Sequence, residues 1–374
     1  EWLPLSSLCN LITTGKLNAN AMEDNGAYPF FTCNEEPYRI NTYAFDLEAI
    51  LISGNGSQVG HLNYYNGKFN AYQRTYILGG FNENVDIMYL YYYLMHTLKP
   101  YIHKNSRKGS VPYITMPMLE NFKFPIPCPN NPEKSLAIQS EIVRILDKFT
   151  ALTAELTAEL TMRKKQYNYY RDQLLSFGES EVEWKTLGEI AAYSKSRISF
   201  DKLDKNNYVG VDNLLQNRAG KIQSNYVPTS GNLTEFREGD ILIGNIRPYL
   251  KKIWQADSTG GTNGDVLVIR SCHKSILPRY LYQILADDNF FEYNMQHAKG
   301  AKMPRGNKDA IMKYRLPIPS FEEQTRIVTI LDKFDTLTNS IRECLPREIE
   351  LRQKQYEYYR DLLFSFPKPE AASN

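Results

Sequence analysis

The sequence lacks several features that would place it in a membrane or in an oxidising compartment. None of its 374 residues lies in an apolar run approaching the ~18 residues of a membrane-spanning helix, so no span is predicted. Its five cysteines are scattered without a CxxC pair, which argues against a zinc site and a disulfide framework and fits a reducing cytoplasm. The start, Glu1–Pro4, has neither the basic nor the apolar region of a signal peptide, so we expect a cytoplasmic protein without a membrane partner.

Signatures of catalysis are missing as well. The five histidines lack metal-ligand spacing, and there is no HExxH motif, GxSxG motif or matched acid–base pair. The glycines of Gly54–Gly60 fit neither a dinucleotide-binding nor a P-loop fingerprint and are typical of a turn. The net charge is only +2, so nucleic-acid binding cannot be inferred from the total and would require local patches. We therefore predict a non-catalytic protein that binds and positions other molecules.

Two segments of the chain occur twice. Residues 139–152 and 324–337 are identical at nine of fourteen positions, and residues 163–177 and 352–366 at eleven of fifteen. A long repeat period with divergent sequence between the copies indicates a duplicated architecture. We therefore expect the protein to perform one task twice, with two different specificities.

The repeated segments have the pattern of helices. Apolar residues recur every three or four positions, which predicts one helix in 131–178 and a second in 321–366, followed by a flexible tail at 367–374. Each helix has a single apolar stripe whose simplest partner is the other stripe, so an antiparallel coiled coil is predicted. Pro346 is expected to kink or interrupt the second helix. If unbroken, Ser135–Phe177 would span roughly 60 Å at ~1.5 Å per residue.

The two blocks that precede these helices, 1–130 and 179–320, differ in sequence. Short apolar runs such as Ala49–Ile52 and Asp240–Ile243 stand among Gly, Asn and Pro, which indicates strands joined by loops, and a helix is expected at Met88–Leu98. The predicted fold class is α+β: two mixed α/β domains separated by two long helices, related by a pseudo-two-fold internal repeat.

A tandem motif in the first helix is more specific. Thr153–Leu156 and Thr157–Leu160 both read TAEL and are followed by RKKQYNYYRDQLLSF. With the alternation of block and helix, the whole chain resembles the specificity subunit of type I restriction–modification systems. The second helix departs from the most regular pattern, because TNSIRECLPREIEL replaces a TAEL at 338–351.

The resemblance implies a division of labour. Each block would be a target recognition domain that reads one half of a split site in double-stranded DNA. The helices would set the gap between the halves, with which TAEL copy number is linked in the family, and would dock two methyltransferase subunits. Two restriction/translocase subunits would assemble beyond them. S-adenosylmethionine, ATP and Mg would be bound by these partners, and this chain, which has no NPPF-like or DPPY-like motif and no helicase P-loop, would hold no cofactor.

Each block ends in a basic segment without acidic residues, 99–108 and 299–308. Fixed cations can replace the counterions condensed on DNA, so phosphate contact is predicted; an ordinary solvated loop is the alternative. The predicted contacts in these segments are Lys104, Arg107, Lys108, Lys299, Lys302, Arg305 and Lys308.

A second set of polar residues follows the predicted strands. Asn and Gln can pair with adenine, and Arg with guanine, in the major groove. The alternative is turn chemistry, because Asn and Gly favour turns for backbone reasons, and for any single residue this alternative is favoured. The set comprises Asn55, Gln58, Asn70, Gln73, Arg74, Asn245, Arg247, Lys251 and Asn263.

The near-identical helix ends suggest a common partner. Seam packing alone does not explain similarity on the outer face, although a recent duplication would. The predicted partner contacts are Gln166, Asn168, Tyr169, Arg171, Gln355, Glu357, Tyr358 and Arg360. The alternative function from another class is a two-headed coiled-coil scaffold whose heads bind proteins, which predicts no salt-dependent affinity for DNA.

Overall fold

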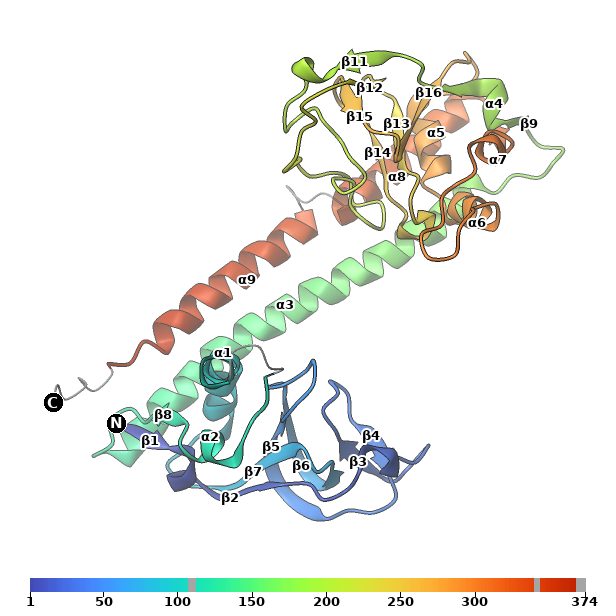
Figure 1. The fold of residues 1–374 in the computed structure, drawn as a ribbon. Coiled ribbons are helices and arrows are strands. Elements are labelled where there is room, and N and C mark those ends of the chain that lie inside the picture. Colours follow the sequence, from blue (N-terminus) through green and yellow to red (C-terminus); the bar gives the residue numbers. More distant parts are fainter. Residues whose placement is uncertain (107–111, 340–343, 368–374) are drawn as a thin grey trace. The chain divides into compact units, whose positions relative to one another are not determined.

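The structure, a computed structural model, describes residues 1–106, 112–339 and 344–367 (Figure 1). The predicted DNA contacts Arg107 and Lys108 lie outside these ranges. Among the described helices, none is long and apolar enough to cross a membrane. The chain divides into two compact units: unit 1 comprises Glu1–Ala151 with Lys354–Asn374, and unit 2 comprises Leu152–Gln353.

Unit 1 is built around a six-stranded sheet with the order β2-β7-β5-β6-β3-β4 and a two-stranded sheet β1-β8. Its strands are β1 (Trp2–Pro4), β2 (Cys9–Thr14), β3 (Tyr28–Phe31), β4 (Tyr38–Ile40), β5 (Phe45–Ser53), β6 (Leu62–Ala71), β7 (Thr75–Phe81) and β8 (Lys123–Pro125). Its helices are η1 (Leu5–Ser7), η2 (Ala19–Ala21), α1 (Ile87–Asn105) and α2 (Met116–Glu120). The predicted strand at Ala49–Ile52 is confirmed within β5, and the predicted helix at Met88–Leu98 within α1.

Unit 2 contains a four-stranded sheet β10-β16-β13-β14, a three-stranded sheet β11-β12-β15 and a two-stranded sheet β17-β9. Its strands are β9 (Glu183–Thr186), β10 (Ala191–Tyr193), β11 (Arg197–Ser199), β12 (Asn232–Phe236), β13 (Ile241–Gly244), β14 (Ile253–Gln255), β15 (Gly260–Thr262), β16 (Val266–Ser271) and β17 (Arg315–Ile318). Its short helices are α4 (Leu187–Ile190), η3 (Phe200–Lys202), η4 (Pro248–Leu250), α5 (Pro278–Leu285), α6 (Asp288–Gln296) and α7 (Lys308–Met312).

The repeated segments form helices, as predicted. The first is one continuous helix, α3 (Pro132–Leu175), and the second comprises α8 (Phe321–Asn339) and α9 (Cys344–Leu363). Pro346 lies in the first turn of α9, where its missing N–H breaks no helical hydrogen bond. In unit 1 the start of α3 meets the end of α9, with the rings of Phe149 and Tyr359 stacked at 5.5 Å. In unit 2 the end of α3 meets α8, with Tyr167 stacked on Phe334 at 5.8 Å.

The six-stranded sheet of unit 1 and the four-stranded sheet of unit 2 share the topology of four strands despite their different sequences. The order β2-β7-β5-β6 corresponds to β10-β16-β13-β14, with every neighbouring pair antiparallel, and β1-β8 corresponds to β9-β17. Helix α1 corresponds to α5 and α6 together: the Tyr89 hydroxyl donates to the Pro125 carbonyl and the Tyr280 hydroxyl to the Pro317 carbonyl, both at 3.2 Å. The pseudo-repeat predicted from the helices therefore extends into the domains.

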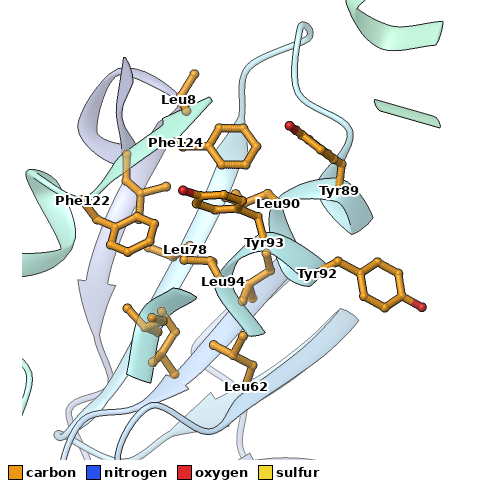
Figure 2. Packing of buried hydrophobic residues seen from close by; sticks show 14 of the residues in the cluster. Leu8, Leu62, Leu78, Tyr89, Leu90, Tyr92, Tyr93, Leu94, Phe122 and Phe124 are labelled. Atoms are coloured by element: carbon orange, nitrogen blue, oxygen red, sulfur yellow. The ribbon is translucent and has the colours of Figure 1, made fainter. Parts of the chain in front are cut away.

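The core of unit 1 forms where α1 packs on the sheet. Asp86 caps α1 by accepting hydrogen bonds from the N–H groups of Met88 and Tyr89 (3.0 and 3.2 Å). Figure 2 shows Tyr93 of α1 beside Phe122 and Phe124, with edge-to-face ring centroids at 6.1 and 5.3 Å. Burying such rings removes a large apolar area from water, which fixes α1 on the sheet.

One buried glutamine docks the repeated helix on each domain. In unit 1 the amide of Gln139 accepts from the N–H of Asp86 and donates to the carbonyl of Asn84, both at 2.9 Å. In unit 2 Gln324 accepts from the N–H of Leu277 and donates to the carbonyl of Ser275, both at 2.8 Å. Both glutamines are 0% exposed. Because the partners are backbone groups, this contact does not depend on which side chains the domain carries.

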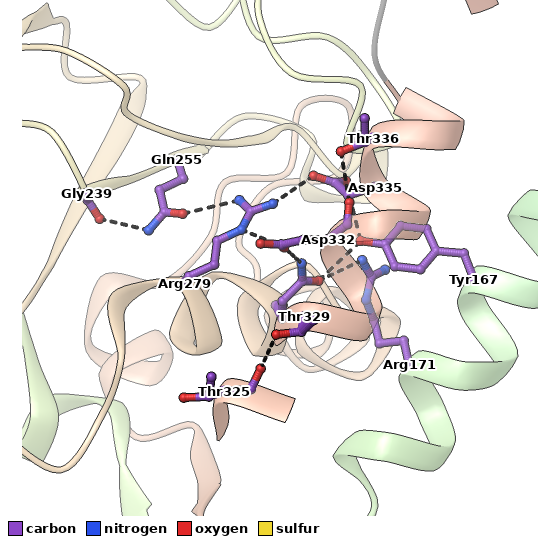
Figure 3. Close-up of polar contacts among 11 residues, drawn as sticks. Tyr167, Arg171, Gly239, Gln255, Arg279, Thr325, Thr329, Asp332, Asp335 and Thr336 are labelled. Atoms are coloured by element: carbon purple, nitrogen blue, oxygen red, sulfur yellow. Dashed lines mark hydrogen bonds and ion pairs between the residues drawn. The ribbon is translucent and has the colours of Figure 1, made fainter. Parts of the chain in front are cut away.

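Beside these shared anchors the units differ. In unit 2, Arg279 of α5 forms ion pairs with Asp332 (2.7 Å) and Asp335 (2.9 Å) of α8 (Figure 3). Asp332 also accepts a hydrogen bond from Gln283 (2.8 Å). Burial opposes the charge of Arg279, but Tyr282 and the two carboxylates outweigh it and raise the pKa of the guanidinium.

Unit 1 has Met88 at the place of Arg279. Its Tyr92 hydroxyl donates to Asp147 at 2.5 Å, as the neutral Gln283 does to Asp332 in unit 2. Burial, and then the hydrogen bond to Asp147, raise the pKa of Tyr92 to about 12, so the phenol remains a donor at neutral pH.

Candidate nucleic-acid interface

Three segments of unit 2 meet where the central strand β13 ends. The N–H of Asn245 donates to the carbonyl of Asp265 (2.8 Å), and its carbonyl accepts from the N–H of Gly306 (3.1 Å). The N–H of Arg247 donates to the carbonyl of Pro304 (2.7 Å). A Cβ on Gly306 would lie 2.6 Å from the side-chain oxygen of Asn245, so a larger residue at 306 would have to displace this buried side chain. We call the three segments, 245–247, 263–265 and 299–306, the loop edge of unit 2.

The same junction occurs in unit 1 at the end of β5. The N–H of Gly54 donates to the carbonyl of Arg74, and the carbonyl of Gly54 accepts from the N–H of Ile114, both at 2.9 Å. Gly54, Arg74 and Ile114 thus occupy the places of Asn245, Asp265 and Gly306. The loop edge of unit 1 consists of 54–58, 72–75 and 112–115.

A cavity of about 280 Å³ opens at the loop edge of unit 1, lined by Gly54, Gln73, Arg74, Tyr76, Tyr113 and Ile114. Gln73 and Arg74, both predicted contacts, are exposed. The Tyr76 hydroxyl donates to the Ile114 carbonyl (2.8 Å) and holds segment 112–115 against the sheet. Tyr113, 43% exposed, is a further candidate that the sequence did not indicate, because it lies beyond the basic segment and outside the Asn/Gln/Arg pattern.

The predicted loop and basic segment of unit 1 are neighbours. Gly60 has φ of 78°, and a Cβ there would lie 3.0 Å from side-chain atoms of Lys99 and Ile102, so the loop packs on the last turns of α1. Lys104 is exposed in the last turn of that helix. The side chains of Asn55 and Gln58 are half-buried in the loop.

The loop edge of unit 2 carries most of the predicted contacts of that unit. Its members are Asn245, Arg247, Asn263, Lys299, Lys302 and Arg305, and Lys308 follows at the start of α7. Arg247 and the four residues from the basic segment are exposed. The guanidinium of Arg305 donates to the carboxylate of Asp265 at 2.7 Å. The acid-free pattern of the basic segments does not indicate Asp265, although this residue follows the predicted contact Asn263 by two positions.

Three predicted base contacts are corrected by the structure. Asn70 is 5% exposed and its amide donates to Thr42 (3.3 Å), so it cannot reach a base from there. The side chain of Asn245 is 6% exposed and supports the loop edge from inside. The amine of Lys251 is bound to Asp288 at 2.6 Å, in a cavity that Lys164, Asn168 and Arg218 also line, rather than placed at the loop edge. Sequence pattern alone cannot tell which side of a strand or loop such residues face.

The predicted partner contacts include two matching exposed tyrosines. Tyr169 is 60% exposed and Tyr358 is 65% exposed. Each lies edge-to-face with the next residue of its repeat, Tyr170 at 5.5 Å and Tyr359 at 5.3 Å. Gln355 and Glu357 are also exposed. The two helix ends therefore present the same aromatic pair to solvent.

Other members of that set are used within their own unit. Arg171 is 2% exposed; its guanidinium lies 4.1 Å over the ring of Tyr167 and donates to Gln283 (3.2 Å), so it is not a surface contact. Gln166 accepts from Arg163 (3.1 Å), and Asn168 accepts from Arg218 (3.4 Å). Arg360 pairs with Asp361 at 2.8 Å. In the part of the chain that the structure describes, no cluster of three or more His, Cys, Asp or Glu could hold a metal.

Comparison with known proteins gives one consistent result. Residues 1–162 and 179–351 match the family described as type I restriction modification DNA specificity domain. The chain is 44% identical over 313 residues, covering 78% of it and 74% of its relative, to the EcoR124I/EcoR124II specificity subunit of Escherichia coli. It is 35% identical, covering 92% and 89%, to the EcoprrI specificity subunit from the same species.

A solved structure agrees at the level of the fold. The S subunit of a type I restriction–modification system from M. genitalium superposes with a TM-score of 0.62 at 17% identity, covering 98% of this chain and 96% of that one. The α+β class and the two-domain repeat are thereby confirmed. The chain belongs to the family of type I restriction–modification DNA specificity subunits.

Proposed function

We propose that this chain reads a split, asymmetric site in double-stranded DNA, one half-site per unit, through the two loop edges. The observation that carries the proposal is the shared junction. In both units, three equivalent segments are joined by equivalent backbone hydrogen bonds, yet the two units present different polar side chains there. A constant frame with variable side chains suits two domains that read different sequences.

The charges of the loop edges support a separation of roles. Lys299, Lys302 and Lys308 are exposed and suit phosphate contact, which positions a protein on DNA without reading sequence. Gln73, Arg74 and Arg305 can contact base edges as hydrogen-bond donors. The near-neutral total charge of +2 means that affinity would come from these local groups.

The helices would serve as spacer and docking surface. We propose target recognition domains at 1–130 and 179–320 and spacer helices at 131–178 and 321–366. Two methyltransferase subunits would dock on the matching tyrosine pairs at Tyr169 and Tyr358, with two restriction/translocase subunits beyond them. Tyr is enriched at interface centres because it offers rigid apolar area together with a polar tip.

Chemistry would then reside on the partners. The chain would position an adenine methyltransferase in the cytoplasm without catalysing a reaction, and S-adenosylmethionine, ATP and Mg would be held by the other subunits. The TAEL copies, 153–160, lie in the continuous helix α3, where one four-residue copy adds about 6 Å at ~1.5 Å per residue. Removing one copy should therefore shorten the gap between the half-sites without changing the bases read.

The test is a methylation map. The chain is expressed with the methyltransferase subunit of its own system in a host that lacks DNA methylation, and modified adenines are mapped by single-molecule sequencing. One split motif with a fixed gap is expected, and deletion of 157–160 should change only the gap. A soluble complex that neither modifies nor binds DNA would contradict the proposal and favour the protein-binding scaffold.

A further inference from the structure

The two loop edges differ in charge at one equivalent position. Arg74 and Asp265 each precede the strand that neighbours the central strand, and each offers its carbonyl to the first residue after that central strand. Unit 1 thus has a guanidinium at this position, where unit 2 has a carboxylate. With side chains of opposite charge, the two edges would not be expected to recognise the same chemical group.

Unit 2 nevertheless brings a guanidinium to the same junction from another segment. Asp265 accepts a hydrogen bond from Arg305 at 2.7 Å. Asp265 is itself held, because its N–H donates to the Asn263 side chain (3.1 Å) and its carbonyl accepts from Asn245 (2.8 Å). The backbone of Arg305 is fixed by two hydrogen bonds with Lys299, at 2.8 and 2.9 Å. The Arg305 side chain is therefore tethered at both ends.

Both guanidinium groups remain available to a ligand. The Arg305 side chain is 51% exposed, and only one of its nitrogens is engaged by Asp265 among the described residues. The Arg74 side chain is exposed at the cavity of unit 1 and has no hydrogen-bond or ion-pair partner within the described ranges. Each loop edge thus presents an arginine fork at this junction, Arg74 from segment 72–75 and Arg305 from segment 299–306. Arg247 is a second exposed arginine on the loop edge of unit 2, but it is not paired with Asp265.

The tether favours a base over a phosphate as the ligand of Arg305. A guanidinium already paired with a carboxylate is a poor counterion for DNA, and the carboxylate itself repels the backbone. An oriented fork, by contrast, matches the N7 and O6 acceptors of guanine, whereas adenine offers a donor in place of the second acceptor.

Resting on the proposed function, we infer that Arg74 and Arg305 each read a guanine, one in each half-site. Asp265 acts as the positioning residue for Arg305. The recognition sequence therefore contains a G·C pair in both halves. The two arginines that read these pairs lie at the same junction but belong to non-equivalent segments of their units.

The test uses the complex with the methyltransferase subunit and the methylation map. R74K should relax the choice of base at one position of one half-site, and R305K at one position of the other. Discrimination should fall by about 5- to 150-fold, which is the range for one bidentate contact. D265N should relax the same position as R305K, and the R305K/D265N double variant should be no worse than R305K. E179Q, which breaks the exposed Arg315–Glu179 pair of unit 2, is the matched control and should leave the motif unchanged.

The possible outcomes distinguish a failure of this inference from a failure of the proposed function. A wild-type motif that lacks a G·C pair in one or both halves would overturn the inference while leaving the proposed function intact. The same holds if R305K weakens methylation equally at all sites, because that is the behaviour of a phosphate contact. A D265N effect confined to a lower unfolding temperature, with the motif intact, would remove the positioning role. A wild-type complex without DNA binding would contradict the proposed function itself.

Discussion

The two units dock the repeated helices through identical anchors and different flanking contacts. Gln139 and Gln324 make the same pair of hydrogen bonds, and both pairs end on backbone groups. The contacts between side chains differ. Tyr92 donates to Asp147 in unit 1 as Gln283 donates to Asp332 in unit 2, but unit 2 adds Arg279, which pairs with two aspartates where unit 1 has Met88. Docking through backbone groups places little constraint on domain sequence. This explains how one helix repeat can carry two domains whose sequences have diverged.

Removing one of the two glutamines that anchor the repeated helices should cause the largest loss of stability. Gln324→Ala takes the hydrogen-bond partner from the N–H of Leu277 and from the carbonyl of Ser275, which are both partly buried, and this should cost about 2–4 kcal/mol. Gln139→Ala should cost about as much in unit 1. Urea unfolding gives the free energies, and hydrogen exchange of the sheet amides identifies the unit that opens. Gln353→Ala, at an exposed position, is the control, and equal stability of all three variants would refute the anchoring role.

Replacing the Arg279 ion pairs of unit 2 by the residues found in unit 1 should show how much these ion pairs stabilise unit 2. Arg279→Met introduces the residue that unit 1 has at the equivalent position 88 and leaves Asp332 and Asp335 without their cation. A loss of about 1–3 kcal/mol is expected, because both half-buried carboxylates lose the guanidinium that balances their charge, while the hydrogen bond from Gln283 to Asp332 remains. Adding Asp335→Thr, the residue of unit 1 at position 150, should recover part of the loss in urea unfolding. If the double variant is less stable than Arg279→Met alone, Asp335 stabilises unit 2 through contacts other than its ion pair with Arg279.

The same pair of units should respond differently to salt. Raising NaCl from about 0.1 to about 1 M shortens the Debye length from ~10 to ~3 Å and should weaken the Arg279 pairs of unit 2. The Tyr92–Asp147 contact of unit 1 joins a neutral donor to a charge and should change less. Hydrogen exchange at both salt concentrations would reveal the difference, and Arg279→Met should abolish it.

Substitutions of the exposed tyrosines test whether the two helix ends bind the same partner equally well. Tyr169→Ala should remove one methyltransferase subunit from the complex and Tyr358→Ala the other, each by weakening docking roughly 10-fold or more, as for interface tyrosines. Mass measurement of the assembled complex distinguishes two, one and no bound subunits. Because both side chains are exposed, the unfolding free energy should stay within ~0.5 kcal/mol of the wild type. Full occupancy of the double variant would exclude this docking surface.

The sequence predicted the frame well because repeats and periodicity are local signals. The identical segments gave the helices, and residues flanking strand ends predicted most of the loop edges. The errors concern partners far along the chain. The pairing of Lys251 with Asp288 and the burial of Asn70 and Arg171 follow from tertiary contacts that no local pattern encodes. The pairing of Asp265 with Arg305 could not be predicted either, because a cluster of cations in the sequence does not indicate which carboxylate lies beside it.

The smallest expected effect is a pH response confined to unit 1. His96 of α1 stacks on Phe364 and lies 3.5 Å from Asp361, whereas the equivalent residue of unit 2 is Asp287. Burial, together with the charge of Arg360, lowers the pKa of His96 from 6.5, and Asp361 only partly offsets this. The folded state thus binds the proton more weakly than the unfolded state. The stabilisation is full above the unfolded pKa of about 6.5 and is lost as the pH falls toward the folded value.

A His96→Gln variant separates this titration from the general loss of stability in acid. Between about pH 7 and pH 5 the wild type should lose more protection from hydrogen exchange in α1 than the variant, because only the wild type carries the imidazole. The amides of α5 and α6 should behave alike in both proteins. If α1 of the variant loses protection as steeply as the wild type does, the acid sensitivity of unit 1 comes from its carboxylates, and the units then differ in docking chemistry but not in response to pH.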